Sequence, residues 1–142
     1  MLSFVVYGVP APQGSMRAFN VRGRRHPVVT SDNQRTRPWK QAVIVAAHDA
    51  RGLEPPIDGA ARVDVTFYMP RPKSAPKSRR SPLTKPDLDK LVRAVLDALT
   101  DAGAWRDDAQ VVLITAAKVF AGGEQDATPN GIPRAAIVVQ RF

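Results

Sequence analysis

Apolar and polar residues alternate along three separate stretches of the chain, a pattern that predicts β-strands. Ser3 to Val9 is rich in aromatic and β-branched residues and ends at Pro10. Ala61 to Met69 carries an apolar side chain at every second position, and Ile132 to Phe142 contains a late, largely apolar run. Patterns of this kind are typical of strands with one buried face. We therefore expect strands near the start, in the middle and at the end of the chain.

A fourth stretch, Ala109 to Val119, is apolar at both alternating sets of positions. A strand with two apolar faces is usually covered on both sides, so we expect this strand at the centre of the sheet. Asp107 and Asp108 come directly before it. We expect a short loop to bring these two carboxylates beside the start of the preceding helix.

Two further stretches follow the helical period of three to four residues. One covers about residues 36 to 51 and stops at Gly52. Trp39 lies on its apolar stripe and is expected in the core rather than as a platform for base stacking. The other helix is predicted to begin with Thr84 as its N-cap and to run to about Ala102.

The predicted order of elements is strand, possible hairpin, helix, strand, helix, strand, strand, with the hairpin turning at Gly23. This order predicts a single α+β domain over residues 1–142, with two helices packed on one face of a mixed or largely antiparallel sheet. A chain of 142 residues suffices for one such domain and is too short for two. No apolar run approaches the roughly 18 residues that span a bilayer, and the first residues lack the pattern of a secretory signal. We expect a cytoplasmic protein with no membrane partner.

Basic residues dominate the charge of the chain and are concentrated in two segments. The net charge is +8, and the pI is about 10.6. A strongly basic surface attracts polyanions, so nucleic acid is the expected partner, although a solvated basic surface without a specific partner is the alternative. One segment is the hairpin region, and the other is the proline-rich residues 71–83, predicted to be a flexible basic arm. The residues expected to contact DNA phosphates are Arg17, Arg22, Arg24, Arg25, Arg71, Lys73, Lys77, Arg79, Arg80 and Lys85.

Against this basic background, residues 81–110 form an acidic island with six of the 13 acidic residues and only four of the 21 Lys and Arg. Clustered carboxylates raise one another's pKa, and a divalent cation is the simplest compensation. Hard oxygen ligands suit Mg²⁺ or Mn²⁺, whereas a chain with no cysteine and two histidines offers little for zinc. The candidate metal ligands are Asp87, Asp89, Asp107 and Asp108.

Spacing alone leaves a structural reading of these aspartates equally open. Asp87 would then cap a helix, and Asp107 with Asp108 would form a turn, because Asp favours both positions for structural reasons. If the metal reading holds, Asp87 must lie in the non-helical segment that enters the helix and Asp89 in its first turn. Asp97 lies two turns further along, about 12 Å from Asp89, too far to share a metal with it.

The segment Lys85-Pro-Asp-Leu-Asp-Lys-Leu-Val-Arg-Ala-Val-Leu-Asp-Ala-Leu, followed by Asp107-Asp108-Ala-Gln-Val, resembles the RusA family of phage and bacterial Holliday-junction resolvases. The family pattern reads approximately Lys-Pro-Asp-x-Asp-Asn-Leu-x-Lys, then Asp-Ala-Leu, then Asp-Asp-x-Gln-Val and a downstream Lys. The close match covers about Thr84 to Lys118. The resemblance implies a homodimeric endodeoxyribonuclease, dependent on Mg²⁺ or Mn²⁺, that nicks four-way DNA junctions symmetrically.

The resemblance also implies roles for single residues. Asp87 and Asp89 match the paired family aspartates, Asp108 matches the third catalytic aspartate, and Asp107 is its acidic neighbour. Arg93 stands where the family usually has a functional Lys, and an Arg fork is not equivalent to a compact ammonium. Lys118 matches the downstream Lys and is expected among the DNA-binding residues. Gln110 also matches and is expected to be a supporting residue, whereas Lys90 stands in place of the usual Asn.

Three other functions compete with a junction resolvase. The first is another metal-dependent nuclease, acting on flaps, single strands or RNA with the same carboxylates. The second is a junction-binding protein without activity, which the departures at Lys90 and Arg93 favour. The third is a basic structural protein, which would bind no metal.

Overall fold

The structure is a computed structural model that describes residues 1–14, 16–20, 22–26, 28–31, 34–128 and 130–142, with the backbone only at 16–19 and 28–31. A four-stranded sheet forms its centre, with the strands in the order β1-β6-β4-β5. The β1/β6 and β6/β4 pairs are antiparallel, and β4/β5 is parallel. The strands are β1 (Leu2–Tyr7), β4 (Ala61–Met69), β5 (Val111–Phe120) and β6 (Arg134–Arg141).

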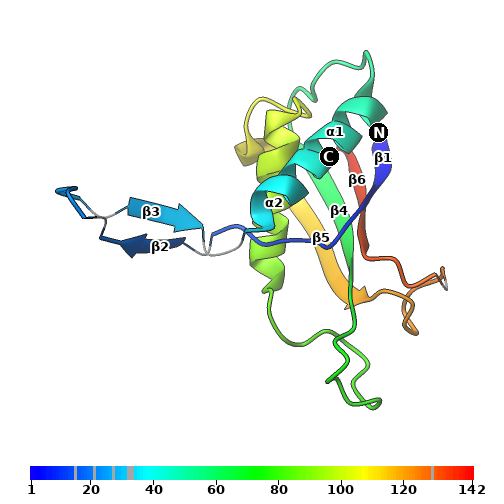
Figure 1. The fold of residues 1–142 in the computed structure, drawn as a ribbon. Coiled ribbons are helices and arrows are strands. Elements are labelled where there is room, and N and C mark those ends of the chain that lie inside the picture. The colour runs from blue at the N-terminus through cyan, green and yellow to red at the C-terminus, as the bar shows by residue number, and fades with distance from the viewer. Residues whose placement is uncertain (15, 21, 27, 32–33, 129) are drawn as a thin grey trace.

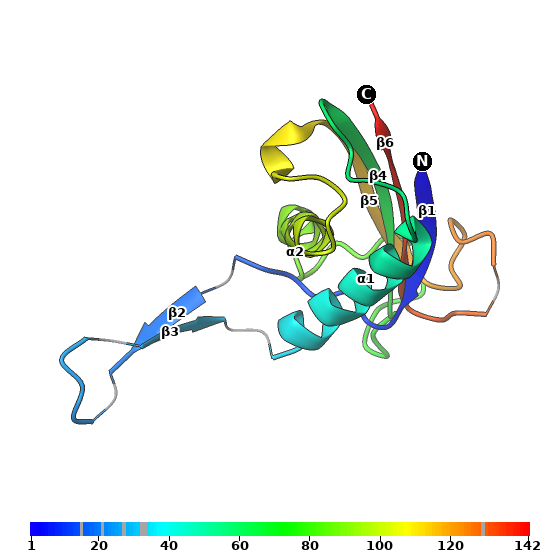
Figure 2. The same ribbon diagram turned by 90° about the horizontal axis from the view of Figure 1, so that it is seen from above.

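Two helices cover one face of this sheet (Figures 1 and 2). They are α1 (Thr36–Arg51) and α2 (Leu88–Asp101). Every second side chain of β4 is buried, and α2 adds Leu91, Val95 and Leu99 to the same core. Trp39 is 4% exposed, so its predicted place in the core is confirmed. The predicted α+β class, the order of elements and the mixed sheet with two helices on one face are confirmed as well.

The prediction that the apolar stretch Ala109 to Val119 forms a central strand is wrong. This stretch forms β5, which pairs only with β4 in the described part of the chain and therefore lies at the sheet edge. Val112, Leu113 and Ile114 are 57%, 36% and 43% exposed. The centre is taken by β4 and by β6, which pairs with β1 and β4. Two apolar faces therefore do not by themselves place a strand at the centre of a sheet.

The predicted hairpin is present and projects away from the body of the molecule (Figures 1 and 2). It consists of β2 (Met16–Phe19) and β3 (Val28–Ser31), and Phe19 pairs with Val28. Gly23 has a φ of +87° in the connecting segment, a value that favours glycine. Arg22, Arg24 and Arg25 lie in this segment and are exposed.

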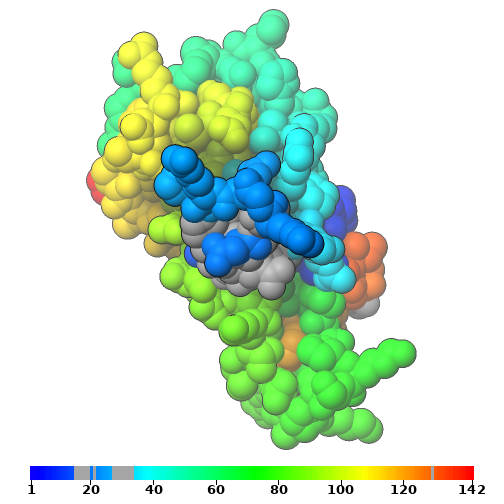
Figure 3. Space-filling view, turned by 60° about the vertical axis from the view of Figure 1, so that its left-hand side comes forward, coloured from blue at the N-terminus to red at the C-terminus, as the bar shows by residue number. Residues whose placement is uncertain are grey.

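Residues 71–83 form an irregular loop at the end of the molecule opposite the start of β5 (Figure 3). Arg71 donates hydrogen bonds to the carbonyl oxygens of Pro76 and Arg79, at 2.7 and 2.8 Å, and lies over the ring of Phe120. The loop is therefore cross-linked by one of its own cations. No helix in the described residues has the length and apolar character needed to cross a membrane.

A buried ion pair fixes the connection between β5 and β6. Asp126 accepts hydrogen bonds from the Arg134 guanidinium at 2.6 and 3.0 Å and from the backbone amides of Gly122 and Thr128. The guanidinium also stacks over the Tyr68 ring, 3.9 Å from its centre. Arg134 and these amides hold the pKa of the Asp126 carboxyl well below its ordinary value.

Candidate active site

Asp87 and Asp89 lie at the N-terminal end of α2 and are both exposed. Asp87 is the N-cap residue, with extended backbone dihedral angles, and Asp89 lies in the first turn, as a shared metal site requires. The Asp87 side chain makes no capping hydrogen bond and contacts the Lys90 ammonium at 3.6 Å. Thr84 was predicted as the N-cap, and this is wrong, because the helix begins three residues later than expected.

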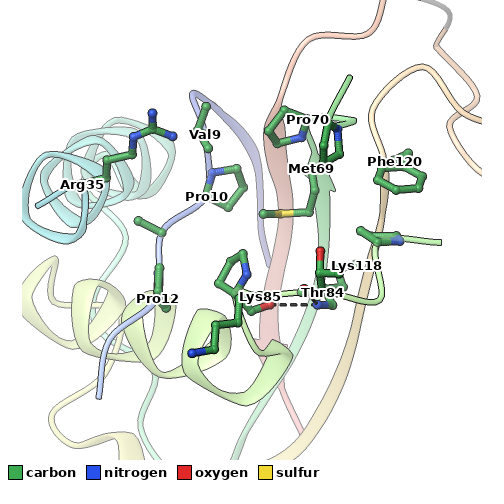
Figure 4. Close-up of a pocket in the computed structure, with 14 residues that line it drawn as sticks. Val9, Pro10, Pro12, Arg35, Met69, Pro70, Thr84, Lys85, Lys118 and Phe120 are labelled. Carbon is green, nitrogen blue, oxygen red and sulfur yellow. Dashed lines mark hydrogen bonds between the residues drawn. The ribbon is translucent and has the colours of Figure 1, made fainter. Parts of the chain in front are cut away.

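Lys118 on β5 explains why the helix begins late. Its ammonium donates hydrogen bonds to the carbonyl oxygens of Thr84 and Pro86, at 2.7 and 2.8 Å (Figure 4). These bonds hold the segment before Asp87 against the sheet and outside the helix. Lys118 was predicted to contact DNA, but two of its three N–H groups are directed into the protein. Both carbonyls belong to the three residues that precede Asp87.

Arg93 lies one turn after Asp89 on the same side of α2, and an N-terminal segment packs against it. The amide of Gln13 donates a hydrogen bond to the carbonyl of Lys90 at 2.9 Å. A Cβ at Gly14 would meet a guanidinium nitrogen of Arg93 at 2.8 Å, and Gly14 has a φ of +108°. The positive φ favours glycine here, and the segment forms a wall beside the Arg93 guanidinium.

Asp107 and Asp108 lie beside the opposite end of α2, and the prediction that they adjoin its start is wrong. Because β4 and β5 are parallel, the helix that connects them must run back along the sheet, so β5 begins where α2 ends (Figure 1). Asp107 caps the short 3-10 helix Asp108–Gln110 by accepting a hydrogen bond from the amide of Ala109. Asp108 is exposed.

Gln110 holds this end of the site in place. Its amide group donates to the carbonyls of Ile57 and Gly59 and accepts from the amides of Arg106 and Asp107. These four contacts fix the turn that carries the two aspartates. The side chain has no N–H left for a substrate, which fits the supporting role expected for it.

A hollow of about 360 Å³ connects this end of the site with the middle of α2. It is lined by Lys40, Asp97, Thr100, Asp101, Arg106, Asp107 and Asp108. Burial raises the pKa of Asp97, Asp108 raises it further, and the Lys40 ammonium opposes the shift. Asp97 is two turns from Asp89 and therefore distant from it, but it is a neighbour of Asp108. Sequence reasoning missed Lys40, which is brought here by the packing of α1 against α2.

The chemistry of these side chains fits Mg²⁺ or Mn²⁺. No three His, Cys, Asp or Glu side chains within the described ranges converge on one point. Mg²⁺ does not need such a cage, because it commonly binds one or two carboxylates, several waters and phosphate oxygens of the substrate. Exposed carboxylates at both ends of α2 meet that requirement.

The cations predicted to bind DNA differ in how far the fold already uses them. The exposed side chains of Lys73, Lys77 and Lys85 have no hydrogen bond or ion pair to other described residues. Arg71 and Lys118 are bonded to backbone carbonyls, and Arg80 lies 4.0 Å from Glu124. The side chain of Arg17 lies outside the described part of the structure.

Comparison with known proteins places the chain in a family. The family described as Endodeoxyribonuclease RusA matches residues 8–126. The chain belongs to the RusA family. It is 34% identical over 129 residues to the Uncharacterized protein YqaN of Bacillus subtilis (strain 168), covering 84% of this chain and 87% of that protein. It is also 34% identical over 123 residues to Crossover junction endodeoxyribonuclease RusA of Escherichia coli (strain K12), covering 84% and 88%.

A RusA-family protein from a virus is almost as similar. The crossover junction endodeoxyribonuclease of Enterobacteria phage 82 is 32% identical over 123 residues, again covering 84% of this chain and 88% of the phage protein. The matched region includes both ends of α2 and Lys118. This RusA-family chain is therefore an endonuclease that acts on DNA, and the reading as a basic structural protein is excluded.

Proposed function

We propose that this chain resolves four-way DNA junctions by paired, symmetric nicks, using Mg²⁺ or Mn²⁺ and acting as a homodimer. The observation that carries the proposal is the exposure of Asp87 and Asp89 on a segment that the fold holds in place. Both carboxylates are exposed at the start of α2, and the segment before them is held by the two hydrogen bonds of Lys118. A rigid segment that presents exposed carboxylates on a basic protein suits a metal ion brought together with a phosphate.

The catalytic residues of the proposal are Asp87, Asp89, Asp108 and Arg93. Asp87 and Asp89 would hold an ion beside the phosphate that is cut, and Asp108 with Asp107 would hold a second ion at the other end of α2, too far along the helix to contact the same phosphate. The bound metal would supply a polarised phosphate and an activated water. Arg93, one turn from Asp89, would neutralise charge that develops on the phosphate. The wall formed by Gln13 and Gly14 would keep the Arg93 guanidinium on the side of the substrate.

The basic segments would bind the DNA backbone on both sides of this site. The hairpin carries Arg17, Arg22, Arg24 and Arg25, and the proline-rich loop carries Lys73 and Lys77, followed by Lys85. Contacts of this kind hold phosphates and give recognition of shape rather than of bases. A four-way junction offers such a shape, with strands diverging from one point.

The exposed edge of β5 supports the proposed homodimer. Its Val112, Leu113 and Ile114 are exposed, and a long apolar strand at an open edge is normally covered. A second copy related by a two-fold axis would cover it and would place two equivalent sites on a two-fold symmetric junction. Replacing Leu113 with Asp should give a monomer in light scattering that binds a junction but releases single nicks instead of paired ones.

A cleavage assay tests the activity directly. A synthetic four-way junction, incubated with and without Mg²⁺, should give symmetric nicks only with the ion. The same assay on a flap, a single strand, a plain duplex and RNA separates the proposal from other nucleases. Preferred cleavage of any of these over the junction would reject it, and saturating binding without cleavage at any Mg²⁺ or Mn²⁺ concentration would indicate a binding protein.

A further inference from the structure

A pocket lies directly beside the segment that leads into Asp87 (Figure 4). Its volume is about 210 Å³. Met69 and Phe120, at the ends of β4 and β5, are among its apolar residues, and both are buried. Prolines from residues 9–12 and 70–72 contribute further apolar walls. The interior is therefore apolar and rigid, because prolines have little freedom to close it.

The charged residues of the pocket are all cations. Arg35, Lys85 and Lys118 line it, and the Lys118 ammonium is bonded to two carbonyls. None of the described residues that line it is acidic. An apolar interior with a cationic border complements a nucleotide, which combines a base whose flat faces pack against apolar side chains with an anionic phosphate.

We propose that this pocket receives one unpaired nucleotide of the bound DNA, with the base inside and its phosphate against Lys85. Lys85 is two residues before Asp87, so the captured nucleotide would adjoin the phosphate that is cut. The volume has room for one base and not for a base pair. The inference rests on the proposed function, because a junction offers bases at its branch point that unpair at low cost.

The capture of a nucleotide would give the enzyme a means to select its cut site. Phosphate contacts made by the basic segments are the same for every sequence. A pocket that accepts one base distinguishes bases by size and by the cost of unstacking them. Cleavage would then be favoured at positions where the base that fits the pocket lies beside the scissile phosphate.

Fluorescence of 2-aminopurine tests the proposal without cleavage. Four-way junctions with one 2-aminopurine at successive positions around the branch point are titrated with the full chain in the absence of divalent metal. Binding is followed in the same samples by the anisotropy of a distant label. One position should show a rise in 2-aminopurine fluorescence that saturates together with the anisotropy.

Variants that fill the pocket from two different walls should remove this rise. Thr84→Trp and Pro72→Trp change exposed residues that line the pocket. The matched controls Leu83→Trp and Ser78→Trp place the same side chain at exposed neighbours that do not line it. Both filled variants should lose the fluorescence rise and bind the junction about ten-fold more weakly, in the range expected for one base contact. The control variants should keep the fluorescence rise and the junction affinity of the unmodified chain.

The possible outcomes distinguish a failure of the nucleotide pocket from a failure of the proposed function. Junction binding without a fluorescence rise at any position in the unmodified chain overturns the nucleotide pocket and leaves the proposed function standing. A rise that persists in both filled variants, with melting temperatures equal to those of the controls, also overturns it. Absence of any anisotropy change would overturn the proposed function, and the pocket proposal with it.

Discussion

Asp126 and the aspartates at the start of α2 are held in opposite ways. The Asp126 side chain is fully buried and accepts hydrogen bonds from Arg134, Gly122 and Thr128. Asp87 is half exposed, its nearest cation is 3.6 Å away, and Asp89 is exposed beside it. A buried carboxylate whose oxygens are all bonded inside the protein cannot bind a ligand, and removing its charge leaves a buried counter-ion that destabilises the fold. A carboxylate whose oxygens are free adds little stability and is available for a ligand.

The same contrast divides the cations. The ammonium of Lys118 and the guanidinium of Arg71 are bonded to backbone carbonyls, whereas Lys73 and Lys77 extend from the same side of the molecule into solvent. Charge in the sequence therefore has two uses in this chain, and only the contacts of each side chain tell them apart. The following experiments test this division.

The largest expected effect follows from removing one of the exposed carboxylates at the start of α2. Asp87→Asn and Asp89→Asn should each lower the cleavage rate by about 10²–10³-fold or more, because one electrostatic contribution to the transition state is lost. Junction binding should stay the same or become tighter, since a negative charge near DNA is removed. Single-turnover cleavage and anisotropy measure the two quantities.

Asp49→Asn is the matched control, since Asp49 is an exposed carboxylate on α1 away from the site. It should leave the cleavage rate unchanged. Asp97 cannot serve as the control, because it shares a hollow with Asp108. An equal loss of binding and cleavage in the Asp87 and Asp89 variants would contradict their assignment.

For the buried carboxylate of Asp126, we expect a loss of stability rather than a loss of cleavage. Asp126→Asn leaves the Arg134 charge buried without a counter-ion, which should lower the free energy of unfolding by about 3 kcal/mol. Cleavage by the folded fraction at low temperature should be unchanged, since this pair lies in the connection between β5 and β6. Urea unfolding and single-turnover cleavage distinguish the two effects.

The pH dependence of stability tests whether the Asp126–Arg134 pair acts through its charges. Because Arg134 lowers the pKa of Asp126 in the folded state below the ordinary value of 3.8, the stabilisation is present above that pH and is lost as the pH falls below it. The difference in unfolding free energy between the unmodified chain and Asp126→Asn should be constant above about pH 5 and shrink below about pH 4. A difference that does not change in this window would show that the pair does not act through charge.

A smaller effect is expected at Lys118. Lys118→Met should lower cleavage by about 10- to 100-fold, the usual range for residues that orient metal ligands. The salt dependence of junction binding should not change, whereas removal of a residue that touches DNA would reduce its slope. Mn²⁺ affinity measured by electron paramagnetic resonance should fall, and Lys118→Arg should restore part of it, because a guanidinium can also donate to two carbonyls. Unchanged Mn²⁺ affinity with a reduced salt slope would place Lys118 on the DNA.

The smallest effect concerns the loop 71–83. Replacing Lys73 and Lys77 with Ala should reduce the log-log salt slope of binding by about 0.9 for each duplex phosphate that the protein no longer neutralises. Arg71→Ala should change this slope less and instead increase proteolysis of the loop, because Arg71 bonds the loop to itself. Anisotropy titrations over a range of salt and limited proteolysis test both. If Arg71→Ala had the larger effect on the slope, the division of the cations would be wrong.

The sequence by itself determined the elements of this fold and the chemistry of its site. Periodicity placed α1 at Thr36–Arg51 and β4 at Ala61–Met69, where the structure has them. The position of Asp87 before the helix and of Asp89 in its first turn also followed from their spacing, because residues two apart diverge on a regular helix. Local sequence patterns carry this information, because the periodicity of the apolar residues depends only on the helix or strand that contains them.

Only the tertiary structure decided how these elements meet. The parallel pairing of β4 with β5 sends α2 back along the sheet, which separates Asp108 from Asp89 and brings it to Asp97 and Lys40. The use of Lys118 as an internal bond to Thr84 and Pro86 joins residues more than 30 positions apart. Strand partners and long-range hydrogen bonds are chosen by the packing of the whole chain, and no local pattern of hydrophobicity or charge encodes them.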